Sequence, residues 1–193
     1  MREGTKDRIL QTGAEIIHRK GFNNTGIQEI LDVAGVPKGS FYNYFKSKED
    51  FGLQVIDYFV GQSALFVKGI LEDATVTPLH RVKMVLDRFL DLFKSNAYSC
   101  GCPIGNLSQE MGDLSPAFRE KLRQAVDSIV DMYSDLLAQA QRAGEISDDL
   151  DVRETAYFIV SSWHGALMRM KIEKGPEPLQ NHRNFIFDCV LRP

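Results

Sequence analysis

Residues 21–51 read GFNNTGIQEILDVAGVPKGSFYNYFKSKEDF, and this stretch decides the fold. Apolar residues recur three and four positions apart before and within it, as they do along nearly the whole chain, and no segment sustains a strand-like alternation. The sequence therefore predicts an all-α protein. Gly21 and Gly35 each follow a helical pattern, where a glycine commonly ends a helix. Three short helices are expected within about the first 45 residues, and the second and third have helix-turn-helix spacing.

Side chains that can cap helices mark the expected helix starts. Thr25 and Gln28 form a T-x-x-Q capping box before the second short helix, and Pro37 suits the first turn of the third, expected from Pro37 to about Tyr44. Ser47 precedes a long helix, Pro78 and Pro116 each suit the first turn of a later helix, and Asp151 is expected to cap another. The later helices are expected over residues 48–71, 78–96, 104–111, 116–142, 151–174 and 178–191. The chain thus divides into a helix-turn-helix domain, residues 1–47, and a larger helical domain, residues 48–193, with about nine helices in all.

The charge of the chain is unevenly distributed. The 193 residues carry 23 basic and 26 acidic side chains, and the net charge of -3 taken alone argues against a nucleic-acid partner. Residues 1–48, however, hold eight basic and five acidic side chains, a net of +3, which leaves -6 on the rest. No apolar run approaches the ~18 residues of a membrane span, and the three cysteines fit a reducing compartment. A soluble, cytoplasmic protein is expected.

The third short helix, PKGSFYNYF, carries side chains that a purely structural helix does not require. Phe41 and Phe45, four residues apart, can anchor one face. The free face or exposed amino end is then left to Lys38, Gly39, Ser40, Tyr42 and Asn43. Hydroxyl and ammonium groups placed this way can donate to phosphate oxygens, and a lysine can also reach a guanine edge. This helix is the candidate for DNA recognition.

Residues 21–51 resemble the DNA-binding domain of TetR-family transcriptional repressors, which has a G-F/Y-x-x-T start, an A-G-V-x-x-G-x-F/L-Y-x-Y/H-F segment and a following S/N-K-E/D. The resemblance implies DNA contacts at the start of the second helix, on the recognition helix and at the start of the long helix. With Asn43 from the free face, the DNA-binding candidates are Thr25, Gly26, Gln28, Lys38, Gly39, Ser40, Tyr42, Asn43, Tyr44 and Lys48. Pro37 and Gly26 depart from the family pattern, in which hydroxyl residues are common.

The resemblance also implies a homodimer, because the family dimerises through its last two helices, here residues 151–174 and 178–191. The residues that suit such an interface equally suit a monomer core: Ala156, Ile159, Val160, Gly165, Ala166, Phe185, Ile186, Cys189 and Val190. A two-fold dimer matches a palindromic operator with half-sites in successive major grooves. The implied function is a repressor released from its operator by a small-molecule effector or by cysteine modification.

Residues 101–119, GCPIGNLSQEMGDLSPAFR, resemble the NemR-like, electrophile-responsive branch of the family, in which Cys102 takes the position of the sensing cysteine. A helix dipole stabilises a thiolate at the amino end of a helix, and the branch implies Lys171 as a nearby basic partner. Reversible binding of an apolar ligand is the other open possibility. The candidates for sensing or effector binding are Cys102, Cys100, Phe66, Phe89, Phe93, Leu107, Met111, Tyr133, Trp163 and Lys171. Each can also be an ordinary core residue.

Other functions fit the sequence less well. Cys100 and Cys102, even when taken together with His164 or His182, lack a second matched pair of metal-ligand residues, so neither a metal nor a cofactor is expected. A cysteine enzyme requires a histidine base converging on the thiol, and the spacing gives no sign of it. A redox-active thiol protein or enzyme with an incidental helix-turn-helix is the alternative function, and a purely structural helical dimer is a third class.

Overall fold

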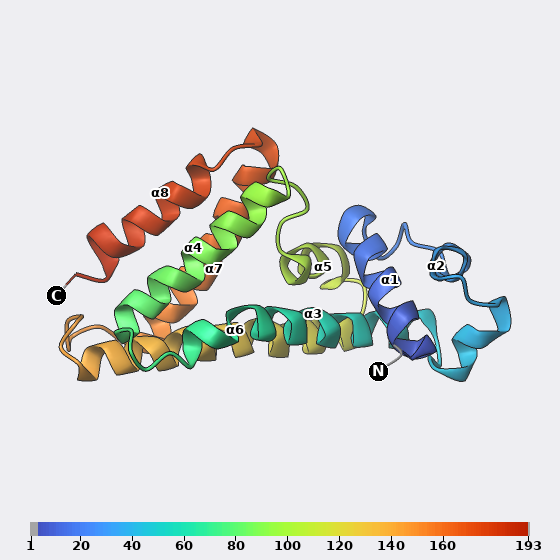
Figure 1. Ribbon diagram of the computed structural model, residues 1–193, viewed down its shortest axis with the longest axis horizontal. Helices are drawn as coiled ribbons and strands as arrows, with labels where there is room; N and C mark the ends of the chain where they lie inside the picture. Colours follow the sequence, from blue (N-terminus) through green and yellow to red (C-terminus); the bar gives the residue numbers. More distant parts are fainter. Residues whose placement is uncertain (1–3, 193) are drawn as a thin grey trace. The chain divides into compact units, whose positions relative to one another are not determined.

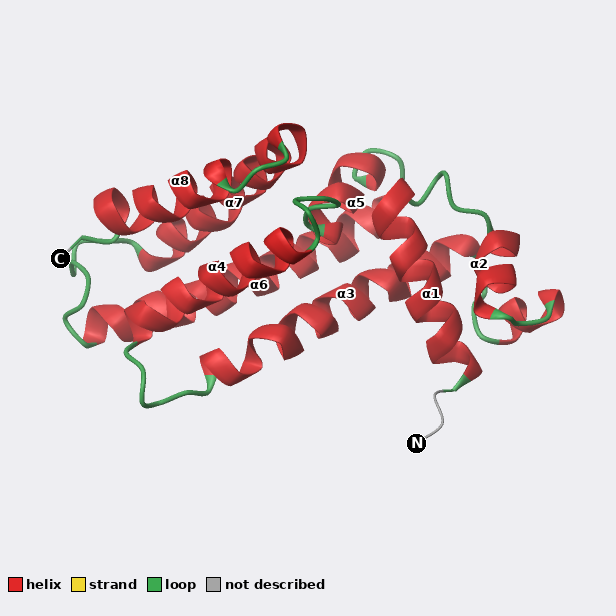
Figure 2. Ribbon diagram, turned by 45° about the horizontal axis from the view of Figure 1, so that its top comes forward, coloured by secondary structure: helices red, strands yellow, loops and turns green. Residues whose placement is uncertain are grey.

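A computed structural model describes residues 4–192 as helices joined by turns and loops, without a strand in that range (Figure 2). The helices are α1 (Thr5–Lys20), α2 (Ile27–Ala34), α3 (Lys48–Leu71), α4 (Pro78–Ser95), α5 (Pro103–Met111), α6 (Pro116–Arg142), α7 (Val152–Glu173) and α8 (Glu177–Phe185). A 3-10 helix, Lys38–Asn43, lies between α2 and α3, and a π-helical turn, Ile186–Val190, continues α8. The all-α prediction is confirmed, and the expected bounds of α3 to α7 agree within one residue at each end.

Side-chain caps fix two of the helix starts where the sequence placed them. The Ser47 hydroxyl oxygen accepts a hydrogen bond from the backbone N–H of Asp50 at 3.0 Å, directly before α3. The Asp151 carboxylate accepts from the backbone N–H groups of Arg153 and Glu154, both at 2.9 Å, at the start of α7. These bonds satisfy amide groups that a helix leaves without partners at its amino end.

The capping box expected at Thr25 and Gln28 is wrong. The residue that precedes α2 is Gly26, which has no side chain to cap with. The Thr25 hydroxyl instead donates to the carbonyl oxygen of Gly21 at 2.6 Å, and the Gln28 amide donates to the Asp32 carboxylate at 2.6 Å. Thr25 therefore closes the turn between α1 and α2, and Gln28 pairs along α2.

The described chain divides into two compact units. The first comprises the residues up to Ser63 together with Pro103–Ala125, and the second comprises Ala64–Cys102 together with the chain from Val126 onward. α3 and α6 each contribute their amino-terminal part to the first unit and the remainder to the second. The expected domains, residues 1–47 and 48–193, divide the chain by function rather than by packing and remain a prediction. Their residues 1–3 and 193 lie outside the described range.

A cluster of aromatic rings holds the 3-10 helix against α3 in the first unit. Phe41, Phe45 and Phe51 are fully buried, and their ring centres lie 4.9 to 5.5 Å apart. Each such pair adds about 0.5–1.5 kcal/mol beyond the burial of its area. Gly13 of α1 lies against the Phe51 ring, where a Cβ atom would overlap it. Phe41 within the 3-10 helix and Phe45 just after it thus anchor this segment from one side, as the sequence predicts.

The second unit is built around α4, α7 and α8 with the ends of α3 and α6, and α7 and α8 pack side by side (Figure 1). Arg81 is buried, at 8% exposure, and its guanidinium donates to the carbonyl oxygen of Leu71 and to the side chain of Gln139, both at 2.8 Å. These bonds join the end of α3 to α4 and α6. None of the described helices is both long and apolar enough to cross a membrane.

Candidate functional site

The polar side chains of the 3-10 helix lie on the surface of the first unit. Lys38, Gly39 and Asn43 are exposed, Tyr42 is 67% exposed, and Ser40 is partly buried. The helix is shorter and more tightly wound than the α-helix expected from Pro37 to about Tyr44, and it covers Lys38–Asn43. Behind this surface lie the buried rings that anchor it, so the helix presents a fixed polar and aromatic face to solvent.

The candidates at the start of α2 differ in exposure. Gly26 and Gln28 are exposed, whereas Thr25 is only 1% exposed and its hydroxyl is engaged with Gly21. Because its side chain is buried away from solvent, Thr25 stabilises the turn between α1 and α2 in this structure. Tyr44, just after the 3-10 helix, is 40% exposed. The exposed candidates of both helices belong to the same compact unit.

Lys48 begins α3, and its side chain packs over an aromatic ring. The ammonium nitrogen lies 4.6 Å from the centre of the Phe22 ring, within the range of a cation–π contact. Burial lowers the pKa of Lys48, which the charge of Glu110 opposes and that of Lys20 assists. Lys48 is thus a partly buried cation in a fixed place, next to the turn that leads into α2.

The segment between α4 and α5, which carries two thiols, has an unusual backbone. Four of its residues have φ in the left-handed region, namely Ala97 at 50°, Tyr98 at 55°, Cys100 at 66° and Gly101 at 71°. Residues other than glycine are strained there, and such strain tends to occur at functional sites. The Lys174 ammonium group, just beyond α7, lies 3.5 Å from the Ser99 hydroxyl. Cys102 is partly buried and directly precedes α5.

Most of the aromatic effector candidates gather in the second unit. Phe93 belongs to a small apolar cluster, and Phe89, Trp163 and Cys102 pack against it. Tyr133 belongs to a larger cluster, and Phe66, Phe89 and Trp163 pack at its edge. The ring centres of Phe66 and Phe89 lie 5.4 Å apart. The structure therefore brings six of the ten candidates together.

The other four effector candidates lie outside these two apolar clusters. Leu107 and Met111 are buried in α5, which belongs to the first unit. Cys100 lies in the strained segment, and Lys171 lies in the last turn of α7. Among the described residues, no group of three His, Cys, Asp or Glu side chains is placed to hold a metal ion.

Comparison with known families agrees with the geometry of both units. The bacterial regulatory proteins of the tetR family match residues 9–55, which hold most of α1, all of α2 and the 3-10 helix, and the start of α3. The tetracyclin repressor-like carboxy-terminal domain matches residues 78–186, more than half of the chain. The chain belongs to the TetR family.

Relatives within this family cover nearly the whole chain. The transcriptional repressor DhaR of Mycobacterium sp. strain GP1 is 33% identical over 190 residues, which are 98% of this chain and 94% of DhaR. The transcriptional regulator AcuR of Cereibacter sphaeroides is 35% identical over 173 residues, 90% of this chain and 79% of AcuR. The crystal structure of the reduced form of Escherichia coli NemR superposes with a TM-score of 0.87 at 26% identity, over 98% of this chain and 100% of NemR.

The last two helices of this TetR-family chain expose large apolar side chains. The exposed ones on α7 and α8 are Tyr157, Phe158, Met168, Ile172 and Phe185, at 48 to 73% exposure. Of the residues expected at a dimer interface, Ala156, Ile159, Val160 and Ile186 are buried within the single chain, whereas Gly165, Phe185 and Cys189 are exposed. The sequence pattern missed Tyr157 and Phe158, since periodicity alone does not show which helix faces remain uncovered.

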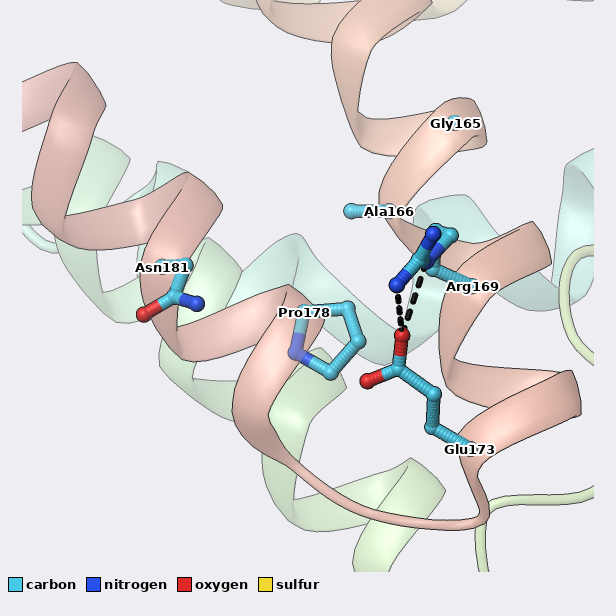
Figure 3. A pocket seen from close by; sticks show the side chains of 6 residues that line it. All are labelled: Gly165, Ala166, Arg169, Glu173, Pro178 and Asn181. Atoms are coloured by element: carbon cyan, nitrogen blue, oxygen red, sulfur yellow. Dashed lines mark hydrogen bonds and ion pairs between the residues drawn. The ribbon is translucent and has the colours of Figure 1, made fainter.

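A shallow groove of 270 Å³ lies between the same two helices (Figure 3). Its lining residues are Gly165, Ala166, Arg169, Glu173, Pro178 and Asn181. The Arg169 Nε–H donates to the Glu173 carboxylate at 2.7 Å along one wall. Small and charged side chains at an open groove suit contact with another surface better than enclosure of an apolar ligand.

Proposed function

We propose that this TetR-family regulator is a homodimeric repressor that binds a palindromic operator in double-stranded DNA. The observation that carries the proposal is the two-sided 3-10 helix. Phe41 and Phe45 are buried against α3, while Lys38, Tyr42 and Asn43 face solvent with groups that bind phosphates and base edges. The DNA-binding face comprises the exposed candidates Gly26, Gln28, Lys38, Gly39, Tyr42, Asn43 and Tyr44, with Ser40 and Lys48 beside them.

The charge distribution supports a contact confined to this face. Residues 1–48 carry a net of +3 and the rest of the chain -6. A basic region attracts the phosphate backbone, whereas an acidic one is repelled from it. Because DNA is the proposed partner, the cytoplasm is the proposed compartment.

The exposed apolar side chains of α7 and α8 support dimerisation through these helices. Phe158 and Phe185, at 48% and 53% exposure, are large enough to act as anchors of an interface. A two-fold axis at such an interface makes the same patch meet itself, and it presents two copies of the 3-10 helix to two half-sites. The DhaR relative is named a repressor, and we extend that direction of control to this chain.

We further propose that a small-molecule effector or modification of Cys102 releases the operator. The strained segment around Cys100 and the aromatic cluster against which Cys102 packs support this site. An effector shifts the protein away from its DNA-binding state only if it binds the two states with different affinity. The Escherichia coli NemR structure is of the reduced form, and we extend a redox-linked response to Cys102 of this chain.

Selection from a pool of random DNA duplexes tests the proposed DNA binding. The purified chain is expected to enrich duplexes with two inverted half-sites, and the variant Tyr42→Ala to bind the selected operator at least about tenfold more weakly. Leu114→Ala is the matched control, because Leu114 is also exposed but lies outside the helix-turn-helix. Failure of the parent to enrich any sequence overturns the proposal.

A mobility-shift assay with N-ethylmaleimide tests the thiol. The reagent is expected to release the selected operator from the parent but not from Cys102→Ser, with Cys189→Ser as the control because Cys189 is an exposed thiol on the π-helical turn. Equal release from parent and Cys102→Ser would exclude Cys102 as the trigger and would leave Cys100 or Cys189 as the reacting thiol. A peroxide or quinone that is consumed in many turnovers per thiol would favour the thiol-enzyme alternative, against the regulator names of the relatives.

A further inference from the structure

The carboxylate of Glu110 binds the turn between α1 and α2. Glu110 lies in the last turn of α5, and its Oε2 accepts a hydrogen bond from the backbone N–H of Phe22 at 2.8 Å. Its Oε1 accepts from the backbone N–H of Asn23 at 2.7 Å. Both oxygens are thus engaged by successive amides 88 and 87 residues away in the sequence. Charge-assisted bonds of this kind are shorter and stronger than neutral ones, and a pair of them also fixes orientation.

The residues around the two amides are arranged to admit the carboxylate. Gly21 has φ of 90°, and a Cβ atom at this position would lie 2.9 Å from Glu110 Oε2. The Asn23 side-chain amide donates to the sulfur of Met111 at 3.5 Å, which adds a second contact from α5. The Thr25 hydroxyl closes the same turn through Gly21. A side chain at position 21 would therefore displace the carboxylate.

The turn leads directly into the DNA-binding face. It connects α1 to α2, and Lys48 lies over the Phe22 ring of the same turn. The amides of Phe22 and Asn23 follow the end of α1, and the Asn23 amide is near enough to solvent to bond water instead. The Phe22 amide is partly buried, so Glu110 both satisfies this donor and fixes the position of the turn.

We propose that Glu110 is a positioning residue for operator binding. Through the Phe22 and Asn23 amides it fixes the helix-turn-helix, so that the orientation of the DNA-binding face depends on α5. The inference rests on the proposed DNA-binding function. α5 spans only Pro103–Met111 and begins directly after Cys102, so a rearrangement of α5 that withdraws the carboxylate frees the turn. The helix-turn-helix then samples orientations that fit the operator less well.

Other contacts keep the first unit together when Glu110 is changed. The Ser115 hydroxyl donates to Glu49 at 2.7 Å, and the Lys121 ammonium pairs with Asp57 at 2.6 Å. The rings of Phe22 and Phe118 lie 4.8 Å apart. Glu110→Ala and Glu110→Gln are therefore expected to fold, with melting temperatures within a few degrees of the parent.

The test combines amide spectroscopy with DNA binding in the full chain. In Glu110→Ala, the Phe22 and Asn23 amide signals should move upfield and exchange faster with solvent, and operator affinity should fall about tenfold while affinity for a random duplex changes less than about twofold. Glu110→Gln keeps one acceptor oxygen and should show intermediate shifts. Glu120→Gln is the matched control, since the Glu120 carboxylate accepts hydrogen bonds from Arg123 and Gln124 of its own helix, α6.

The two proposals fail in different ways. If the parent binds a selected operator and Glu110→Ala binds it equally well, the positioning role is wrong and the DNA-binding function stands. Unchanged Phe22 and Asn23 signals in Glu110→Ala also overturn the positioning role. If the parent itself shows no operator preference, the proposed function fails, and the positioning role fails with it.

Discussion

The hydroxyl oxygen of Ser162 and Nε2 of His182 lie 2.9 Å apart, and this contact joins α7 to α8. The His182 ring also packs edge-on against Trp163, with 5.2 Å between ring centres. Burial lowers the pKa of His182, and the nearby backbone of Ile159 opposes part of this shift. The pair of helices proposed to form the dimer thus holds a partly buried, neutral imidazole.

The stability of this chain is expected to fall on mild acidification. The unfolded chain takes up a proton on His182 near pH 6.5, whereas the folded chain does so only at lower pH. The unfolded state then binds more protons, so the contribution is complete above about pH 6.5 and is lost as pH falls toward the lowered pKa. His164, whose pKa burial also lowers, acts in the same direction.

Denaturant unfolding at pH 7.5 and 5.5 measures this effect. The parent should lose stability between the two pH values, and His182→Gln should lose less. His80→Gln is the control, because His80 is exposed at the start of α4. An equal loss in parent and His182→Gln would show that His182 does not carry the effect.

Lys48→Ala is expected to weaken binding to the operator and to random duplexes alike. A lysine that contacts one phosphate releases about one counterion, so the slope of log affinity against log salt should become shallower by about 0.9. Lys68→Ala is the control on the same helix, since Lys68 is exposed and pairs with Glu72 at 3.8 Å. Fluorescence anisotropy over a range of salt concentrations gives both slopes, and an unchanged slope for Lys48→Ala rules out its phosphate contact.

Two glycines of α3 should respond in opposite ways to alanine. A Cβ atom at Gly52 would overlap the rings of Phe22 and Phe118, so Gly52→Ala should destabilise the chain by about 1–3 kcal/mol. At Gly61 a Cβ atom meets nothing within 4 Å, and Gly61→Ala should stabilise the helix by up to about 1 kcal/mol. Urea unfolding distinguishes the two, and a stabilising Gly52→Ala would contradict the packing described for the first unit.

A charge on the exposed face of α7 should separate the proposed dimer. Phe158→Glu would bury an unpaired carboxylate in the interface, and we expect the dimer dissociation constant to rise at least about tenfold. Leu65→Glu is the control, because Leu65 is 66% exposed on α3. Sedimentation velocity at several concentrations reports the masses, and a Phe158→Glu protein that stays as dimeric as the parent places the interface elsewhere.

The features of the fold that the sequence predicts depend on local signals. Pro78 and Pro116 begin helices, Asp151 and Ser47 cap them, and each acts within a few residues of itself. The burial of one side of the segment that holds the 3-10 helix follows likewise from the spacing of Phe41 and Phe45. Such features depend on short-range geometry, and they were predicted correctly.

Long-range contacts account for the features that the sequence did not predict. Thr25 has the pattern of a cap, yet its hydroxyl bonds back to Gly21 in a turn that Glu110 holds from α5. No spacing rule pairs residues so far apart in the chain. The exposure of Tyr157 and Phe158 depends on which elements cover α7, which a single helical pattern does not reveal.

A hydroxyl-radical footprint of the full chain on the selected operator records both the proposed DNA contact and the proposed two-fold arrangement in one measurement. We expect two protected regions related by two-fold symmetry, with centres about 10 base pairs apart or a multiple of that spacing, and we expect both to be lost in Tyr42→Ala. A single asymmetric protected region, or a footprint that Tyr42→Ala leaves unchanged, would contradict this expectation.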